Sequence, residues 1–183
     1  MSALVALGIG AGVVGIARRW WNSPISRTRR LLRRTRVTPI AELTGDVLAC
    51  VVGRVELDGD GLIGPLSGRA CVAYDHEIKT VDGPGMFTTT RVQRRVVPFY
   101  VVDATGRARV FAAEAALSNR PASRGPNHVE RVIEPGMRIR IVGSVIVDPD
   151  FARSSERGYR DGAVRFTLTG SARFPLLVDE MPD

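Results

Sequence analysis

Few side chains in this 183-residue chain could bind a metal ion or serve as a strong nucleophile. The chain has two cysteines, Cys50 and Cys71, and two histidines, His76 and His128. They are dispersed, without the C-x-x-C or H-x-x-x-H spacing that brings zinc ligands together locally. His76 fits a strand face and His128 fits a loop. We therefore predict neither a metal site nor a cofactor.

Catalytic motifs are also missing from the sequence. There is no G-x-S-x-G elbow, no P-loop and no acidic pair in an evident cleft motif. The glycines of residues 8–12 lie inside an apolar run with no strand before them, so they do not indicate a nucleotide site. We predict that the chain has no catalytic residues and is not an enzyme by itself.

The most informative stretch is Gly64–Tyr74, which joins a tight loop to an extended segment. Pro65 fixes its own φ and Gly68 permits positive φ, so the chain can reverse just before the strand begins. From Cys71 onward the polarity alternates with period two, which predicts a strand over 71–81. One face of that strand would carry Val72, Tyr74, His76 and Ile78.

This stretch resembles the signature of the GIDE family, also called the BAM (beside-a-membrane) domain. Residues 99–108, a strand followed by a reversal, resemble the second block of the family. Residues 130–143, a Pro-Gly turn that leads into a strand, resemble the third. The resemblance covers about residues 40–180 and marks these motif and possible interaction residues: Pro65, Leu66, Ser67, Gly68, Arg69, Cys71, Tyr74, Asp103, Gly106, Pro135 and Gly136.

Two of these residues carry a specific expectation. We expect Arg69 to satisfy carbonyl groups that the reversal leaves unpaired, and Tyr74 to point inward. The alternative is that the loop from Pro65 to Arg69 is a partner-binding surface with Arg69 exposed.

Eukaryotic members of the GIDE family resemble membrane E3 ubiquitin ligases, in which a C-terminal RING supplies the ligase chemistry. A RING needs about eight Cys and His ligands, whereas this chain has two of each. The resemblance therefore implies a prokaryotic-type member without a RING, and ligase activity is not expected.

The N-terminal region predicts membrane attachment. Residues 3–17 carry no charge, and as a helix they would span about 22 Å, less than the roughly 30 Å hydrocarbon core. Arginines that snorkel and tryptophans at the headgroups can extend this length. The residues expected at the membrane surface are Arg18, Arg19, Trp20, Trp21, Arg27, Arg29, Arg30, Arg33, Arg34 and Arg36.

We thus predict a single N-terminal span in residues 1–21, an Arg-rich juxtamembrane linker in 22–39 and a β domain in 40–183. The positive-inside rule places that domain in the cytoplasm, where Cys50 and Cys71 are expected to stay reduced. A cleaved signal peptide and a buried or peripheral helix are the alternatives for the apolar run. The linker either binds anionic headgroups or is simply solvated.

The net charge of +7 belongs to the N-terminal segment. Eight arginines fall in residues 18–36, while the rest of the chain holds 18 Lys and Arg against all 19 acids. A hydrophobic content of 44% with 25% charged residues suits one folded domain. The near-neutral domain argues against nucleic acid as the main partner.

Beyond Pro39 the pattern is almost wholly β. Strands are expected at 47–56, with Gly53 as a bulge or close approach, and at 71–81, 86–103, 107–112, 137–147 and 164–170. A short helix is expected at 112–117 and a bend near Pro98. The fold class is mainly β: a small OB-like antiparallel barrel or open sandwich with one short helix, preceded by an N-terminal membrane helix.

These features favour a membrane-anchored, non-catalytic protein-interaction or scaffolding module. Its expected partners are anionic lipid headgroups and an unknown protein. The alternative is OB-like binding of single-stranded nucleic acid at the membrane. The candidate residues for that alternative are Tyr100, Phe111, Arg107, Arg109, Arg138 and Arg140.

Overall fold

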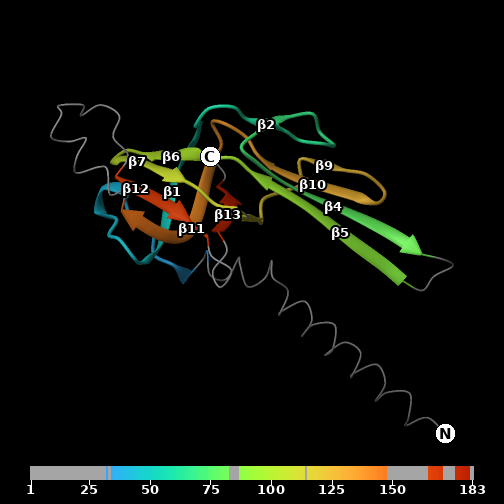
Figure 1. Ribbon diagram of the computed structural model, residues 1–183, viewed down its shortest axis with the longest axis horizontal. Coiled ribbons are helices and arrows are strands. Elements are labelled where there is room, and N and C mark those ends of the chain that lie inside the picture. The colour runs from blue at the N-terminus through green and yellow to red at the C-terminus, as the bar shows by residue number, and fades with distance from the viewer. Residues whose placement is uncertain are drawn as a thin grey trace, which may run out of the picture.

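A computed structural model describes residues 32, 34–82, 87–113, 115–147, 165–170 and 176–181 (Figure 1). A 3-10 turn, η1 (Ile40–Glu42), precedes the first strand. The strands are β1 (Leu48–Leu57), β2 (Leu62–Ile63), β3 (Ala70–Cys71), β4 (Ala73–Asp82), β5 (Phe87–Val96), β6 (Phe99–Asp103), β7 (Gly106–Val110), β8 (Ala115–Leu117), β9 (Ser123–Arg124), β10 (His128–Ile133), β11 (Arg138–Val147), β12 (Phe166–Thr169) and β13 (Leu176–Glu180).

Five strands close into a barrel in the order β1-β6-β7-β12-β11, with β11 pairing back to β1. Alternate residues point inward, and the buried interior is formed largely by Val51, Val55, Phe99, Val101, Ala108, Val110, Ile139, Ile141 and Leu168. The mainly β class is therefore confirmed, in a closed form. The barrel is not wholly antiparallel, because β7 and β12 run parallel.

Strand β1 bends from one neighbour to the next at Gly53 and Arg54. Leu48 to Arg54 pair with β11, and Arg54 to Leu57 pair with β6. A Cβ on Gly53 would lie 2.5 Å from the carbonyl oxygen of Val102. The expected close approach at Gly53 is confirmed, and it lets one strand take part in both pairings.

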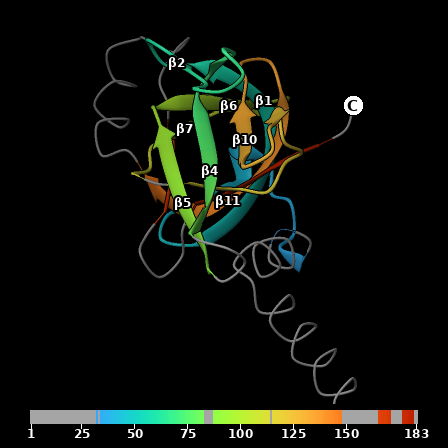
Figure 2. The ribbon, with the colours of Figure 1, turned by 90° about the vertical axis from the view of Figure 1, so that its right-hand side faces the viewer.

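A second sheet, in the order β5-β4-β10-β9, extends from the barrel. Strands β4 and β5 pair without a break from Ala73 and Val96 to Asp82 and Phe87. The two strands lie side by side in both ribbon views (Figures 1 and 2), and Figure 1 shows them reaching beyond the barrel. At the base of the hairpin, Val72 and Ala73 are buried in the barrel core, so the hairpin is anchored at one end.

The structure divides two segments that the sequence analysis treated as continuous. The expected strand at 86–103 is β5 and β6, separated at Val97 and Pro98, where the bend was predicted. The expected strand at 71–81 is mainly β4, preceded by the short β3. The first part of this expected strand is buried on both faces, since residues 71–76 are all buried.

The short helix predicted at 112–117 is wrong. Ala115 to Leu117 form strand β8, which pairs in parallel with Leu176 to Val178 of β13. Ala115 and Leu117 are buried while Ala116 is only partly so. Pairing with a strand from the chain end, which the sequence analysis did not assign, thus overrides the helical propensity of alanine.

The predicted N-terminal span at 1–21 lies outside the described residues, as does most of the linker at 22–39. Within the described ranges, no helix has the length and apolar character needed to cross a bilayer.

Candidate functional site

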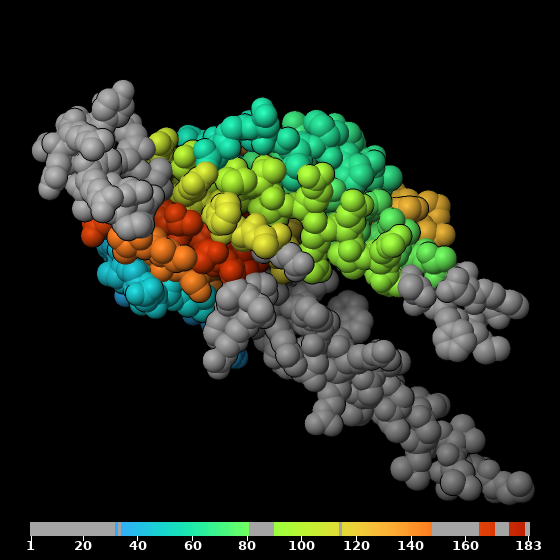
Figure 3. Space-filling view, viewed as in Figure 1, coloured from blue at the N-terminus to red at the C-terminus, as the bar shows by residue number. Residues whose placement is uncertain are grey.

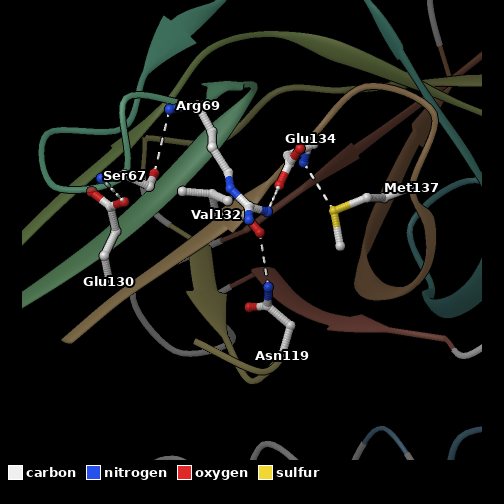
Figure 4. A network of polar contacts seen from close by, with 7 residues as sticks. All are labelled: Ser67, Arg69, Asn119, Glu130, Val132, Glu134 and Met137. Carbon is white, nitrogen blue, oxygen red and sulfur yellow. Dashed lines mark hydrogen bonds and ion pairs between the residues drawn. The ribbon is translucent and has the colours of Figure 1, made fainter. Parts of the chain in front are cut away.

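The Gly64–Arg69 loop folds around a buried carboxylate. Glu130 of β10 is fully buried, and its two oxygens accept hydrogen bonds from the N–H groups of Leu66, at 2.8 Å, and Ser67, at 2.9 Å. Figure 4 shows Glu130 beside Ser67 at the base of the loop. A carboxylate is a strong acceptor for paired backbone donors, so this contact fixes the loop on the sheet.

The backbone of the loop closes on itself as its glycines and proline predict. The N–H of Gly64 donates to the carbonyl of Arg69, and the N–H of Gly68 donates to the carbonyl of Gly64, both at 2.9 Å. Gly68 has a φ of +69°, as expected. A Cβ on Gly64 would lie 2.8 Å from Ser67 Oγ and 3.0 Å from Glu130 Oε2. Glycine at 64 therefore makes room for the carboxylate.

Arg69 does not fill the role predicted from the sequence. Its guanidinium donates to Glu134 Oε1 at 2.8 Å, and the two side chains are 53% and 33% exposed. This is a surface ion pair that links the loop to the Pro135–Gly136 turn, rather than a set of bonds to loop carbonyls (Figure 4). The loop groups that a side chain satisfies are instead N–H groups, those of Leu66 and Ser67, and their acceptor is Glu130, which was not among the predicted residues.

The motif residues separate into buried and exposed sets. Tyr74 points inward as expected and packs with Cys71 and Val132. Pro65 and Leu66 are exposed at the tip of the loop. Asn119, also unforeseen, donates its side-chain N–H to the carbonyl of Val132 at 2.8 Å. The loop thus has a rigid base and a solvent-facing tip.

Asp103 organises the turn between β6 and β7. Its Oδ1 accepts from the N–H and hydroxyl of Thr105 and from the N–H of Gly106, while Oδ2 accepts from the N–H of Ile40. Burial alone would raise the pKa of this carboxyl, but hydrogen bonds from Thr105, Ile40 and Gly106 outweigh it and hold the pKa below its usual range. The second motif block therefore also builds the fold.

The two cysteines are free, buried and apart. Cys50 packs with Leu32, Val142 and Leu177, whereas Cys71 belongs to the Tyr74 cluster. Burial raises the pKa of the Cys71 thiol to about 11, and burial also raises the pKa of Cys50. Neither thiol is set up as a reactive thiolate at neutral pH.

The two histidines meet, which their separation in sequence did not indicate. His76 Nε2 lies 3.1 Å from His128 Nδ1, and the rings stack with centroids 5.3 Å apart. His128 begins β10 rather than lying in a loop. Within the described ranges, no three His, Cys, Asp or Glu side chains gather as a metal site.

The candidates for nucleic-acid binding lie on two parts of the barrel. Tyr100 and Arg109 are opposite each other on β6 and β7, and the guanidinium of Arg107 lies 4.7 Å from the centre of the Tyr100 ring. Arg109 is paired with Asp58 at 2.7 Å. Phe111 is 59% exposed beyond β7, whereas Arg138 and Arg140 lie on β11.

Of the residues predicted at the membrane surface, only Arg34 and Arg36 fall within the described part of the chain, and both are exposed.

Removal of the Glu130 carboxylate is expected to destabilise the fold strongly. In Glu130→Ala the N–H groups of Leu66 and Ser67 lose a charged acceptor, and we expect the free energy of unfolding to fall by about 3 kcal/mol. Glu130→Gln keeps one acceptor and should lose less. Urea unfolding of the purified full-length protein measures both. Arg69→Ala and Glu134→Ala are the controls and should leave the midpoint nearly unchanged; an Arg69→Ala midpoint as low as that of Glu130→Ala would contradict this assignment.

Asp103 is expected to make stability depend on pH in acid. Its pKa in the folded chain is lowered from an unfolded value of about 3.9. The carboxylate therefore contributes stability that is fully present above about pH 4 and is lost as pH falls through the folded pKa. The difference in unfolding free energy between the parent and Asp103→Asn should shrink as pH drops from 6 to 3 in urea titrations. Asp60→Asn is the charge-matched control. The prediction would be refuted if the difference in unfolding free energy between the parent and Asp103→Asn stayed constant with pH.

A scan against protein-family models, a search of curated proteins and a search of solved structures each found no match. The assignment of a function therefore depends on the contacts described above.

Proposed function

We propose that the chain is a membrane-tethered protein-interaction module of the GIDE/BAM type, non-catalytic by itself. The observation that carries the proposal is the β4–β5 hairpin, which projects from the closed barrel and presents its outer strand to solvent. All residues from Thr90 to Arg95 are exposed. Sheet edges of this kind are common sites of protein recognition.

The projecting sheet is held firmly enough to act as a recognition surface. Its root is buried in the barrel core at Val72, Ala73 and Ile133. Two ion pairs join its strands, Arg94 to Asp75 at 3.4 Å and Arg131 to Glu77 at 3.2 Å. A surface held in place before binding loses less entropy when a partner docks.

The contacts of Glu130 and Asp103 support a role in the fold rather than in chemistry. The oxygens of Glu130 are bound to the loop, and those of the half-buried Asp103 are bound to the β6–β7 turn and to Ile40, so both carboxylates already have partners within the fold. The functional groups available to a partner are therefore those at the surface.

Two observations support the proposal that the domain is of the GIDE/BAM type. The barrel order β1-β6-β7-β12-β11, with β7 parallel to β12, resembles that of an OB fold. The first and third motif blocks also meet directly, through Glu130 and through the Arg69–Glu134 pair. Blocks that resemble one family thus form one structural unit, which favours the GIDE/BAM assignment.

Membrane attachment is the second part of the proposal and is supported by the sequence of residues 1–36. The full-length chain should remain in the membrane pellet after an alkaline carbonate wash, because the apolar run and its arginines hold it there. A variant lacking residues 1–31 should be recovered in the supernatant. Release of the full-length chain by the wash would contradict the anchor.

Single-stranded nucleic acid is the second candidate ligand, because Tyr100, Arg107 and Arg109 share the outer face of β6 and β7. OB folds bind oligonucleotides on the face of their second and third strands. Here, however, Arg107 covers the Tyr100 ring and Arg109 is paired with Asp58. A base that stacks on Tyr100 would have to displace Arg107 from the ring. Single-stranded nucleic acid is therefore the weaker candidate.

Site-specific photo-crosslinking in intact cells distinguishes the two candidates. A photoreactive side chain replaces Val92 on β5, Phe111 beside β7, or Ile146 on β11, which are 41%, 59% and 48% exposed. We expect protease-sensitive adducts from position 92 and few from position 146, the control on the barrel. Nuclease-sensitive adducts from position 111 would favour nucleic acid, and equal adducts from 92 and 146 would contradict a specific protein surface.

A further inference from the structure

Strand β5 is an edge of unusual length. It has ten residues, and within the described chain its outer side pairs with no strand. In an antiparallel strand alternate residues direct both their N–H and C=O groups to the same side, so about five residues offer both groups outward. The opposite edge of the same sheet, β9, has only two residues.

Most devices that block an exposed edge are missing from β5. Its pairing with β4 runs through ten residue pairs without a bulge, and the segment Phe87–Val96 contains no proline. In the space-filling view its lime-green atoms form an outer surface (Figure 3). The one feature of β5 that opposes unwanted edge pairing is its positive charge. The strand carries Arg91, Arg94 and Arg95 and no acidic residue.

The three arginines are not equivalent. Arg94 is held by Asp75 on the neighbouring strand. Arg91 and Arg95 make no ion pair within the described ranges and lie with Gln93 on the other face, opposite Ile78 and Tyr74. Two exposed positive charges therefore line one face of the open edge, while Val92, 41% exposed, lies on the other.

We propose that β5 binds an acidic, extended segment of a partner protein, which adds to the sheet as a further strand. This inference rests on the proposed function and names the chemistry of its partner. Main-chain hydrogen bonds between the segment and the open edge supply affinity. Acidic side chains at alternate positions of the segment lie beside Arg91 and Arg95 and supply specificity. The intervening residues of the segment, beside Val92, are apolar.

The same charges argue against a second copy of this chain as the occupant. Two β5 strands placed edge to edge would bring arginines of one copy beside arginines of the other. Like charges opposite one another destabilise a strand pair. Charge repulsion therefore disfavours pairing between two β5 strands, whereas charge attraction favours pairing of β5 with an acidic segment.

Fluorescence anisotropy with the purified full-length protein tests the proposal. The probe is a labelled ten-residue peptide that alternates Glu and Val. We expect it to bind at least about tenfold more tightly than a Lys-Val peptide, and the affinity should fall about tenfold in Arg91→Glu/Arg95→Glu. Arg120→Glu/Arg124→Glu changes the net charge equally at exposed positions away from β5 and should bind as the parent does.

Two further measurements separate strand addition from simple charge attraction. A Glu-Val peptide N-methylated at every residue should fail to bind, because it has no N–H groups to donate. Hydrogen exchange of residues 87–96 in the parent should slow when the unmodified peptide is added.

Several results would overturn the inference. These are equal binding of the methylated peptide, unchanged exchange at 87–96, self-association of the protein that depends on Arg91 and Arg95, and displacement of the peptide by oligo-dT at matched charge. If photo-crosslinks form from position 92 while the acidic peptide does not bind, the interaction module stands and only the acidic strand is refuted. If the peptide binds while no crosslinks form in cells, the edge chemistry stands and the cellular function is refuted.

Discussion

The contact between the Glu130 carboxylate and the N–H groups of Leu66 and Ser67 is the constraint on which the projecting sheet depends. A buried charge is unfavourable unless strong hydrogen bonds compensate for its lost hydration. Here the N–H groups of the loop supply these hydrogen bonds. The carboxylate in turn satisfies backbone donors that would otherwise need water. Since Glu130 lies opposite His76 in the β4–β10 pair, the carboxylate joins the loop to the sheet that contains β5.

The barrel and the second sheet differ in how fully their strands are enclosed. The barrel interior is apolar and closed, whereas the second sheet has one face tied to the loop and an edge open to solvent. The same chain thus combines a stable support with an exposed hydrogen-bonding surface. Recognition surfaces carried by a rigid scaffold follow this arrangement widely.

Local patterns predicted most strands, because β-branched alternation and the turns at Gly59, Gly68 and Gly136 are encoded within a few residues. They could not predict β8, where alanine-rich sequence becomes a strand only because β13 lies beside it. The same limit explains the site. Arg69 and Tyr74 were noticed from the motif, but Glu130 and the contact between His76 and His128 depend on pairing between β4 and β10, which no local spacing reveals.

The pairing of β1 with β11 also determines when the barrel can form. Leu48 pairs with Ser144, and closure further requires β12, which lies between β7 and β11. During synthesis β1 can pair with β6 early, but its other edge has no partner until β11 emerges. Contacts so distant in sequence slow folding and leave strand edges exposed in the meantime. A nascent chain that ends before β11 therefore carries an open edge on β1, where mispairing can begin.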